Sequence, residues 1–194
     1  MKNSFFALIS RMRYIGRWGL MRNSLPENIQ EHSHMVSVIA HALAVIRRDV
    51  FSGEIDPNLV ATAALYHDAS EIFTGDLPSP IKYLNPSILA AYKQVEDVAM
   101  EKLLSLLPEI VQDAYIPLLT NLDEDVHRLI KAADRLSAYI KCLEELRAGN
   151  DEFQSAMREI HRSIEENHLP EMAYFMEHFI PAFHLTLDEL DLSV

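Results

Sequence analysis

The sequence has few of the features that mark secreted, membrane-spanning or turn-rich proteins. Cys142 is the only cysteine among 194 residues, so no intrachain disulfide can form, which suits a reducing cytoplasm. No apolar run reaches the ~18 residues that span a bilayer, and the N-terminal stretch MKNSFFALISRMRYIGRW has too short an apolar core for a signal peptide. The chain contains only 5 glycines, which favours helices over a turn-rich β fold. We therefore expect a cytoplasmic protein with no membrane partner.

The chain also has no excess of positive charge, and its net charge is −12 at pH 7. This charge argues against non-specific binding to a nucleic acid polymer. The first 22 residues are the exception, since they contain no acid and five basic residues: Lys2, Arg11, Arg13, Arg17 and Arg22. Such a segment fits either a localised anion, such as one phosphate, or a positive helix packed on an acidic surface.

Hydrophobic periodicity and capping residues predict helices along nearly the whole chain, without repeats or linkers. The expected helices cover about residues 3–14, 29–49, 57–73, 86–107, 109–120, 124–148, 151–167 and 170–180, with N-caps at Asn28, Asp56, Asn85 and Asp123. Residues 16–26 and 74–80 are expected to be irregular, and Pro181 with the acidic tail should end the domain. We expect an all-α helical bundle that forms a single domain over residues 1–194.

The dipeptide His67-Asp68 lies within ATAALYHDASEIF, an apolar run that otherwise has the pattern of a buried helix. An imidazole beside a carboxylate is costly to bury unless the pair binds something, and a metal ion is the usual partner. His32 and Asp134 complete a candidate ligand set. For His32 the alternative is a hydrogen-bonded core histidine, and for Asp134 it is a surface pair with Arg135.

Helical spacing places His32 on one apolar stripe with Val36, Ile39, Leu43 and Ile46, whereas His34 and His41 lie on roughly the opposite face as structural or surface residues. Asp134 adjoins a packing side formed by Leu129, Ile130, Ala133, Ser137, Ile140 and Leu143. Two imidazoles and two carboxylates suit one divalent transition metal with open positions for water and substrate. The set favours Co²⁺, Mn²⁺, Fe²⁺ or Zn²⁺ over Mg²⁺.

Other residues could complete a reactive site around that metal. Glu71 shares the expected helical face of His67 and Asp68, as a proton relay or as a solvated helix-end acid. Arg17 could clamp a phosphate with two parallel hydrogen bonds. Trp18 offers a face to a sugar or base, or plugs the core. Asp76 could accept a hydrogen bond from a sugar hydroxyl, or be a turn residue.

The order His, His-Asp, Asp is the ligand signature of HD-domain metal-dependent phosphohydrolases. Three longer segments, ENIQEHSHMVSVIAHAL, YHDASEIFTGDLPSPIKY and KAADRLSAYIKCLEEL, resemble the YfbR-type bacterial HD-domain 5′-deoxyribonucleotidases, as do RWGLMRN and FIPAFHLTLDEL. The resemblance covers nearly the whole chain. Its most specific part is the block HDASE-x-x-TGDLP-x-P-x-KY.

The resemblance implies an all-α HD fold that forms a homodimer, with one divalent cation on His32, His67, Asp68 and Asp134. It implies that Glu71 is the catalytic acid/base, that Arg17 orients the phosphate and that Trp18 contacts the nucleotide. The implied substrate contacts also include His32, Asp68 and Asp134, with Asp76, Leu77, Pro78 and Ser79 on the sugar side. We expect a metal-dependent hydrolase of deoxyribonucleoside 5′-monophosphates.

Two other functions fit the same pattern. Another HD activity would be triphosphohydrolysis of nucleotides or cleavage of cyclic nucleotides. A triphosphate would call for more cationic groups near the metal than this acidic chain offers. A non-catalytic nucleotide sensor would not need the intact ligand set and Glu71.

Overall fold

The structure, a computed structural model, describes residues 3–82 and 84–190. Within these ranges the chain is helical and forms no sheet, which confirms the all-α class. The α-helices are α1 (Phe5–Ile9), α2 (Ile29–Asp49), α3 (Pro57–Ala64), α4 (Glu71–Thr74), α5 (Ser79–Lys82), α6 (Pro86–Leu104), α7 (Glu109–Leu119), α8 (Glu124–Arg147), α9 (Gln154–Glu165) and α10 (Pro170–His178). The 3₁₀ helices are η1 (Ser10–Tyr14), η2 (Asp151–Phe153) and η3 (Ile180–His184). None of these helices is long and apolar enough to cross a bilayer.

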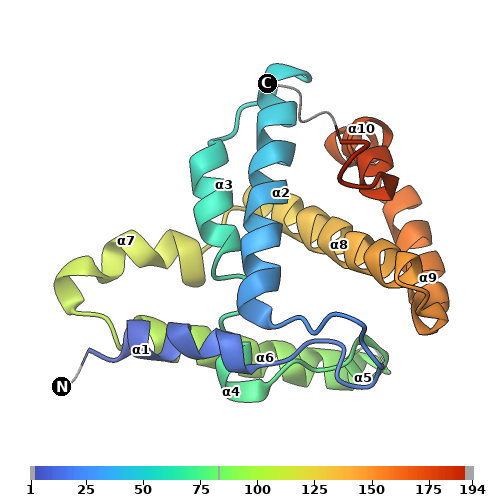
Figure 1. The fold of residues 1–194 in the computed structure, drawn as a ribbon. Helices are drawn as coiled ribbons and strands as arrows, with labels where there is room; N and C mark the ends of the chain where they lie inside the picture. The colour runs from blue at the N-terminus through green and yellow to red at the C-terminus, as the bar shows by residue number, and fades with distance from the viewer. Residues whose placement is uncertain (1–2, 83, 191–194) are drawn as a thin grey trace.

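Helix α2 is the centre of the fold (Figure 1). It packs most extensively against α3 and α8, and α9 and α10 close the other side of α8 and α2. The stripe predicted on α2 is fully confirmed, because Val36, Ile39, Leu43 and Ile46 are all buried. On α8 the predicted packing side is likewise buried. The main core therefore lies where helical periodicity placed it.

A second, smaller core lies below α2 in Figure 1, between α1, α6 and α7. Its buried residues are Phe5, Ala69, Leu103, Leu107 and Leu119. Ala64, at the end of α3, belongs to the main core, whereas Ala69 belongs to the second one. Residues 65–68 therefore pass between two packed regions, and this position fixes His67 and Asp68.

Helix ends follow the predicted caps. Asn28 Oδ1 accepts the backbone N–H groups of Gln30 and Glu31 at 3.0 and 3.1 Å, which fixes the start of α2. Asp56, Asn85 and Asp123 cap α3, α6 and α8 in the same way. The caps thus set the registers of the helices on which the candidate ligands lie.

The predicted helix over residues 57–73 is wrong, because α3 ends at Ala64 and α4 begins only at Glu71. Between them, backbone N–H groups bond three residues back instead of four, as in Ala69 to Tyr66. The His67 ring contributes to the break, since its Nδ1 lies 2.8 Å from the Ala64 carbonyl oxygen. In a continuing helix that oxygen would accept the N–H of Asp68.

Four other details differ from the prediction. The segment expected to be irregular up to Pro80 already contains the start of α5, where a proline fits the first helical turn. Pro181 does not end the ordered chain, because it lies inside η3, and Arg147 Nη1 donates to the Phe183 and Leu185 carbonyls. The helices expected over residues 3–14 and 151–167 each include a 3₁₀ segment, η1 and η2.

Candidate active site and metal centre

The four candidate metal ligands converge where α2, the turn after α3 and the middle of α8 meet. His32 Nε2 lies 3.1 Å from Asp134 Oδ1 and 3.6 Å from Asp68 Oδ2, and His67 Nε2 lies 3.1 Å from the same Asp68 oxygen. One ligand atom each from His32, His67 and Asp68 lies within 4.8 Å of the others. Asp134 joins this group through its contact with His32. Residues from three distant parts of the sequence thus form one cluster.

The spacing and chemistry of the cluster fit a divalent cation. Metal–nitrogen and metal–oxygen bonds of about 2.0–2.2 Å place adjacent ligand atoms about 3.0–3.4 Å apart, close to the distances found. His67 Nε2 is buried and, although it lies 3.1 Å from Asp68 Oδ2, makes no aligned hydrogen bond, while its Nδ1 is committed to the Ala64 carbonyl. His32 Nδ1 similarly lies 3.2 Å from Ser137 Oγ. Such contacts orient metal-binding imidazoles in proteins.

Charges within the cluster set its protonation. Burial, aided by Arg17, lowers the pKa of His32 against the attraction of Asp134 and Asp68. Burial would raise the pKa of Asp68, but His67 and His32 together outweigh it and hold that pKa below its ordinary value. His32 does the same for Asp134, and Asp68 overcomes burial to raise the pKa of His67. Both carboxylates are therefore ionised, which is the form that binds a cation.

Glu71 lies beside the cluster at the start of α4. Its side chain is buried, and its Oε2 atom has no hydrogen-bond partner. Burial, with the negative charges of Asp68 and Asp76, raises the pKa of Glu71 to about 9. The predicted common helical face with His67 and Asp68 is absent, because the helix is broken there. A turn brings Glu71 to the site instead. Because Glu71 is buried, the alternative of a solvated acid at a helix end is wrong.

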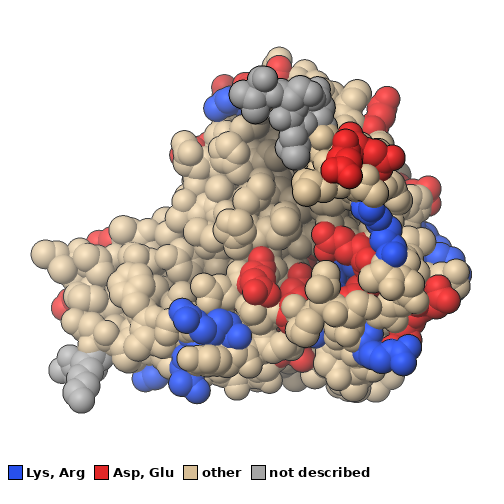
Figure 2. Space-filling model, viewed as in Figure 1, with Lys and Arg blue, Asp and Glu red and all other residues tan. Residues whose placement is uncertain are grey.

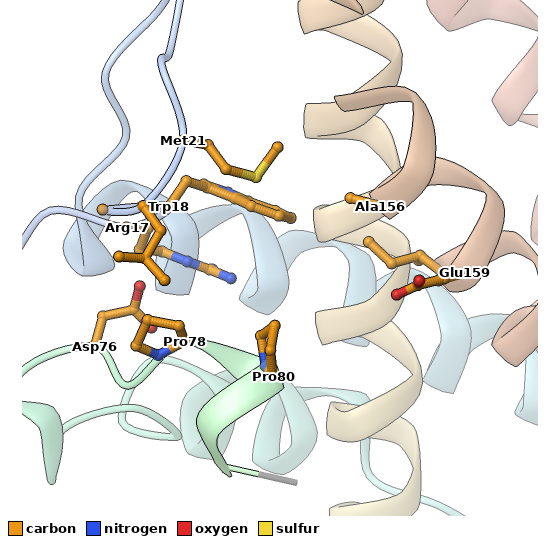
Figure 3. A pocket seen from close by; sticks show the side chains of 11 residues that line it. Arg17, Trp18, Met21, Asp76, Pro78, Pro80, Ala156 and Glu159 are labelled. Atoms are coloured by element: carbon orange, nitrogen blue, oxygen red, sulfur yellow. The ribbon is translucent and has the colours of Figure 1, made fainter. Parts of the chain in front are cut away.

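A cavity of about 240 Å³ opens between the N-terminal loop, the segment that leads into α5, and α9 (Figure 3). Arg17, Trp18 and Met21 form one wall, with Asp76, Pro78 and Pro80 below them and α9 opposite. The charge of Arg17 acts on the cluster, since it contributes to the lowered pKa of His32 and partly opposes the raised pKa of Glu71. The candidate ligands themselves do not line the cavity, so Arg17 and Asp76 are the lining residues whose charges reach the cluster and Glu71.

Arg17 is held with part of its guanidinium unpaired. Its Nε atom lies 3.6 Å from Glu27 Oε2, whereas Nη1 is buried without a hydrogen-bond partner. The other described arginines of the basic segment, Arg11, Arg13 and Arg22, are exposed. On the face drawn in Figure 2, a group of basic side chains lies over α1, and several acidic side chains lie over α9 and α10. The geometry of Arg17 fits the anion hypothesis, whereas Arg11, Arg13 and Arg22 lie at the surface. Lys2 lies outside the described residues.

Trp18 lies on the cavity wall with its ring fixed from two sides. Its Nε1 donates to Glu27 Oε2 at 3.1 Å, and its ring centroid lies 5.2 Å from that of Phe153. Its backbone φ is 58°, a left-handed conformation that is unusual for a non-glycine residue. Trp18 covers buried Phe153, as the core interpretation expects, and its place on the cavity wall leaves the contact with a sugar or base a prediction.

Asp76 faces the cavity from the segment after Gly75, whose φ of 72° suits a glycine. Burial raises the pKa of Asp76, partly offset by Arg17 and by the backbone N–H of Trp18, which donates to its carboxylate. Pro78 lines the cavity, whereas Leu77 is half-buried outside its lining. Ser79 begins α5, and its side chain lies outside the described part of the structure.

Several residues of the site carry no signal in the sequence. Ser137 was predicted only as a packing residue, yet it contacts the His32 ring. The far wall of the cavity comes from Ala156, Glu159 and Ile160 on α9, which no motif marks. His34 and His41, predicted to be structural or surface residues, are exposed. Asp134 contacts His32, as a member of the ligand set should, whereas the neighbouring Arg135 is exposed.

The helical fold and its His, His-Asp, Asp cluster define an HD-domain phosphohydrolase. Solved structures share this fold. An HD-domain phosphohydrolase from Listeria innocua matches with a TM-score of 0.80 and 24% identity, over 93% of this chain and 88% of that one. The HD phosphohydrolase of cyanophage S-2L, described as bound to dA and one catalytic Zn²⁺, matches with a TM-score of 0.62 and 20% identity, over 93% and 96% of the chains.

The chain belongs to the 5′-deoxynucleotidase YfbR-like family, which matches residues 4–183. The 5′-deoxynucleotidase of Cronobacter sakazakii is 49% identical, over 97% of this chain and 96% of that protein. The 5′-deoxynucleotidase YfbR of Shigella boydii is 48% identical, over 98% and 97%. The predicted family and enzyme class are therefore confirmed.

Proposed function

We propose that this protein hydrolyses deoxyribonucleoside 5′-monophosphates to deoxyribonucleosides and inorganic phosphate. Relatives that are about half identical over nearly the whole chain are named 5′-deoxynucleotidases. The site offers what such a reaction needs, namely a cluster suited to a cation, a buried cationic nitrogen and a buried acid. A deoxynucleotide with one phosphate suits a cavity of about 240 Å³ with one unpaired arginine nitrogen.

The observation that carries this proposal is that one cationic and one acidic side chain each have a buried polar atom without a hydrogen-bond partner. Arg17 Nη1 and Glu71 Oε2 each lack a hydrogen-bond partner. Buried polar groups are normally paired, so such exceptions point to an absent partner. A phosphomonoester supplies both kinds of partner, because its phosphoryl oxygens accept from a guanidinium and its ester oxygen accepts a proton.

The residues divide the reaction between them. Arg17 offsets the charge that builds on the phosphoryl oxygens as water attacks phosphorus. Glu71, protonated at neutral pH by its raised pKa, gives its proton to the leaving 5′-oxygen directly or through water. Trp18, Asp76 and Pro78 line the cavity and would border the nucleoside. Leu77 and Ser79, on the same segment, are further proposed contacts on the sugar side.

His32, His67, Asp68 and Asp134 would hold one divalent cation. That cation supplies positive charge to the phosphoryl group and lowers the pKa of water at the site. A set of two nitrogens and two carboxylates suits Co²⁺, Mn²⁺, Fe²⁺ or Zn²⁺ better than Mg²⁺. We propose Co²⁺ or Mn²⁺ first, with Zn²⁺ and Fe²⁺ as alternatives that the same ligands accept.

Phosphate release from a panel of substrates tests the proposal. The purified protein is given dNMPs, NMPs, dNTPs and cyclic nucleotides, each with Co²⁺, Mn²⁺, Mg²⁺ or Zn²⁺. We expect inorganic phosphate from dNMPs. Triphosphate released from dNTPs would instead identify a triphosphohydrolase, and a linear nucleotide from a cyclic one would identify a phosphodiesterase. Nucleotide binding without any turnover would identify a sensor.

We also propose that the protein acts as a cytoplasmic homodimer. Large apolar side chains such as Val98 and Ile110 are 65% and 92% exposed, which favours association with a second copy. The buried free thiol of Cys142 suits a reducing compartment. Light scattering coupled to gel filtration measures the mass, and a monomer at micromolar concentration would refute the dimer.

A further inference from the structure

The loop that carries Arg17 and Trp18 is closed at its base and otherwise irregular. An isolated bridge joins Gly16 and Asn28, and the N–H of Arg17 donates to the Glu27 carbonyl at 2.9 Å. Beyond this base the loop over residues 18–26 contains no helix or strand, and Leu20 and Leu25 are 74% and 63% exposed. Within the loop, Glu27 contacts Arg17 and Trp18, and the Trp18 carbonyl accepts the N–H of Met21. These contacts hold the near side of the loop and leave open what holds residues 22–25 on its far side.

A buried cluster on α8 and just after it holds the far side of this loop. Glu145 accepts the backbone N–H groups of Ser24 and Leu25 at 2.8 and 3.2 Å. Lys141 pairs with Glu145 and donates to the Leu25 carbonyl. Asn150 donates to the Arg22 carbonyl at 2.7 Å and to Glu145 at 2.8 Å. We call Lys141, Glu145 and Asn150 the loop anchor.

The loop anchor is placed where water does not reach. Glu145, Lys141 and Asn150 are 1%, 5% and 6% exposed. The hydrogen bonds and the ammonium group overcome the effect of burial and lower the pKa of Glu145 to about 2. Because a buried ion pair often stabilises a fold no better than apolar residues of the same volume, this one calls for a further reason to be present.

The loop anchor also reaches Trp18 through one ring. Lys141 Nζ lies 5.7 Å from the Phe153 ring centroid, and Phe153 packs on Trp18 at 5.2 Å. Trp18 keeps its left-handed φ of 58°, which persists in a non-glycine residue only where its surroundings impose it. The backbone bonds to residues 22–25 and this ring contact provide such surroundings.

The helix that supports the loop anchor also carries a candidate metal ligand. Lys141 and Glu145 follow Asp134 by two and three helical turns, so all three lie within about 40° on one face of α8. We propose that the loop anchor positions Arg17 and Trp18 relative to the metal cluster, with α8 as the common rigid support. This positioning role rests on the proposed function, although the anchoring itself does not.

Trp18 is the only tryptophan of the chain, so its fluorescence reports on the loop alone. The test uses Glu145→Gln and the double variant Lys141→Met/Glu145→Leu. The double variant removes both charges and keeps the volume, so it is expected to fold even where Glu145→Gln does not. In both, we expect Trp18 emission at longer wavelength and at least about twofold stronger quenching by acrylamide below the melting temperature, since the ring loses its fixed position.

The kinetic arm measures kcat/KM for dAMP together with metal content. We expect kcat/KM to fall roughly 10- to 100-fold, as a displacement of about 1 Å in a positioning group does, while metal content stays as in the wild type. The control is Glu171→Gln, which breaks the buried pair with Arg47 between α10 and α2. It should lower the melting temperature without changing Trp18 emission or kcat/KM.

Two results would overturn the role of the loop anchor. One is a folded double variant with the emission, quenching and kcat/KM of the wild type. The other is a changed emission with unchanged kcat/KM. If the wild-type protein cleaves no dNMP, the proposed function fails by itself, and the Trp18 readout still decides whether the loop anchor holds the loop.

Discussion

The imidazole of His67 donates its Nδ1–H to the carbonyl oxygen of Ala64 at 2.8 Å, and this bond turns Nε2 toward the other candidate ligands. The same oxygen also accepts the backbone N–H of His67 at 3.3 Å, in place of the Asp68 N–H that would continue α3, so it lies at the end of a helix and orients a ligand. The protein therefore gives up helix continuity at the point where the cluster forms.

Replacement of His67 or Asp68 by alanine should abolish metal binding and turnover together. Each removes one of four ligands, and the loss of one ligand also leaves its buried neighbours unpaired. Metal content after gel filtration and phosphate release from dAMP measure the two effects. His34→Ala is the matched control, since His34 is exposed on α2 and should keep both. Full activity of either metal-depleted variant would rule out the assigned cluster.

Glu71→Gln should keep the metal and lose roughly 10²- to 10⁴-fold in kcat, the usual contribution of a general acid or base. The amide preserves the shape of the side chain but has no acidic proton to give. Metal analysis and kcat for dAMP distinguish this outcome from a ligand role. A parallel loss of metal and activity would instead make Glu71 part of the metal shell.

Periodicity and caps were sufficient to predict the helices that hold the site, because the stripe of His32 on α2 depends on local spacing alone. The break between Ala64 and Glu71 could not be predicted in this way. It depends on a side chain competing for a backbone carbonyl and on two cores that residues 64 and 69 enter separately. His32 and Asp134 are 102 residues apart, and their contact was expected from the ligand order of a known family, since helical spacing cannot predict which helices meet.

The cavity is the part of the site that could be predicted only by resemblance. Arg17, Trp18, Asp76 and Pro78 were predicted as site residues by resemblance and do line it. The wall from α9 was not predicted, since Ala156 and Ile160 look like ordinary residues of an amphipathic helix. Glu145 likewise has the sequence position of a surface acid near a helix end, yet the tertiary fold leaves it only 1% exposed.

The protein should prefer dAMP to AMP by roughly 10- to 100-fold in kcat/KM, which is the most that a site usually achieves against one added hydroxyl. The segment below Trp18 contains Pro78 and Pro80, which have no backbone N–H to pair with a 2′-hydroxyl. Steady-state kinetics on both nucleotides measure the ratio. Equal values would refute the deoxyribose preference and leave nucleotidase activity intact.

The loop anchor should make stability depend on pH in the acid range. The pKa of Glu145 falls from 4.5 to about 2 on folding, so its contribution is complete above pH 4.5 and is lost as the pH falls toward 2. Integrated over that interval, it amounts to about 3 kcal/mol. Urea unfolding at pH 6 and pH 3 measures the slope in the wild type and in Glu145→Gln.

Asp68 and Asp134 also have lowered pKa values and add a slope of the same sign. The difference between the two proteins isolates the part due to Glu145. An acid sensitivity in Glu145→Gln as steep as in the wild type would mean that this carboxylate is not ionised by its partners as described.

Arg17→Ala should reduce kcat/KM for dAMP by roughly 10²- to 10³-fold, as expected for loss of one charge-stabilising donor. Stability should change little. The ion pair with Glu27 is long, at 3.6 Å, and Trp18 Nε1 still binds the same carboxylate. Removing a buried nitrogen without a partner also relieves a desolvation cost. Kinetics, melting temperature and metal content together separate these effects.

Arg17→Lys should restore only part of the activity, because an ammonium group cannot make two parallel contacts with a phosphate. Arg13→Ala is the control for general loss of charge, since Arg13 lies in the same basic segment but is exposed on η1. It should keep both kcat/KM and the melting temperature. If Arg17→Ala melted far earlier than the wild type yet turned over dAMP normally, the guanidinium would be a structural tie for the loop and not a phosphate ligand.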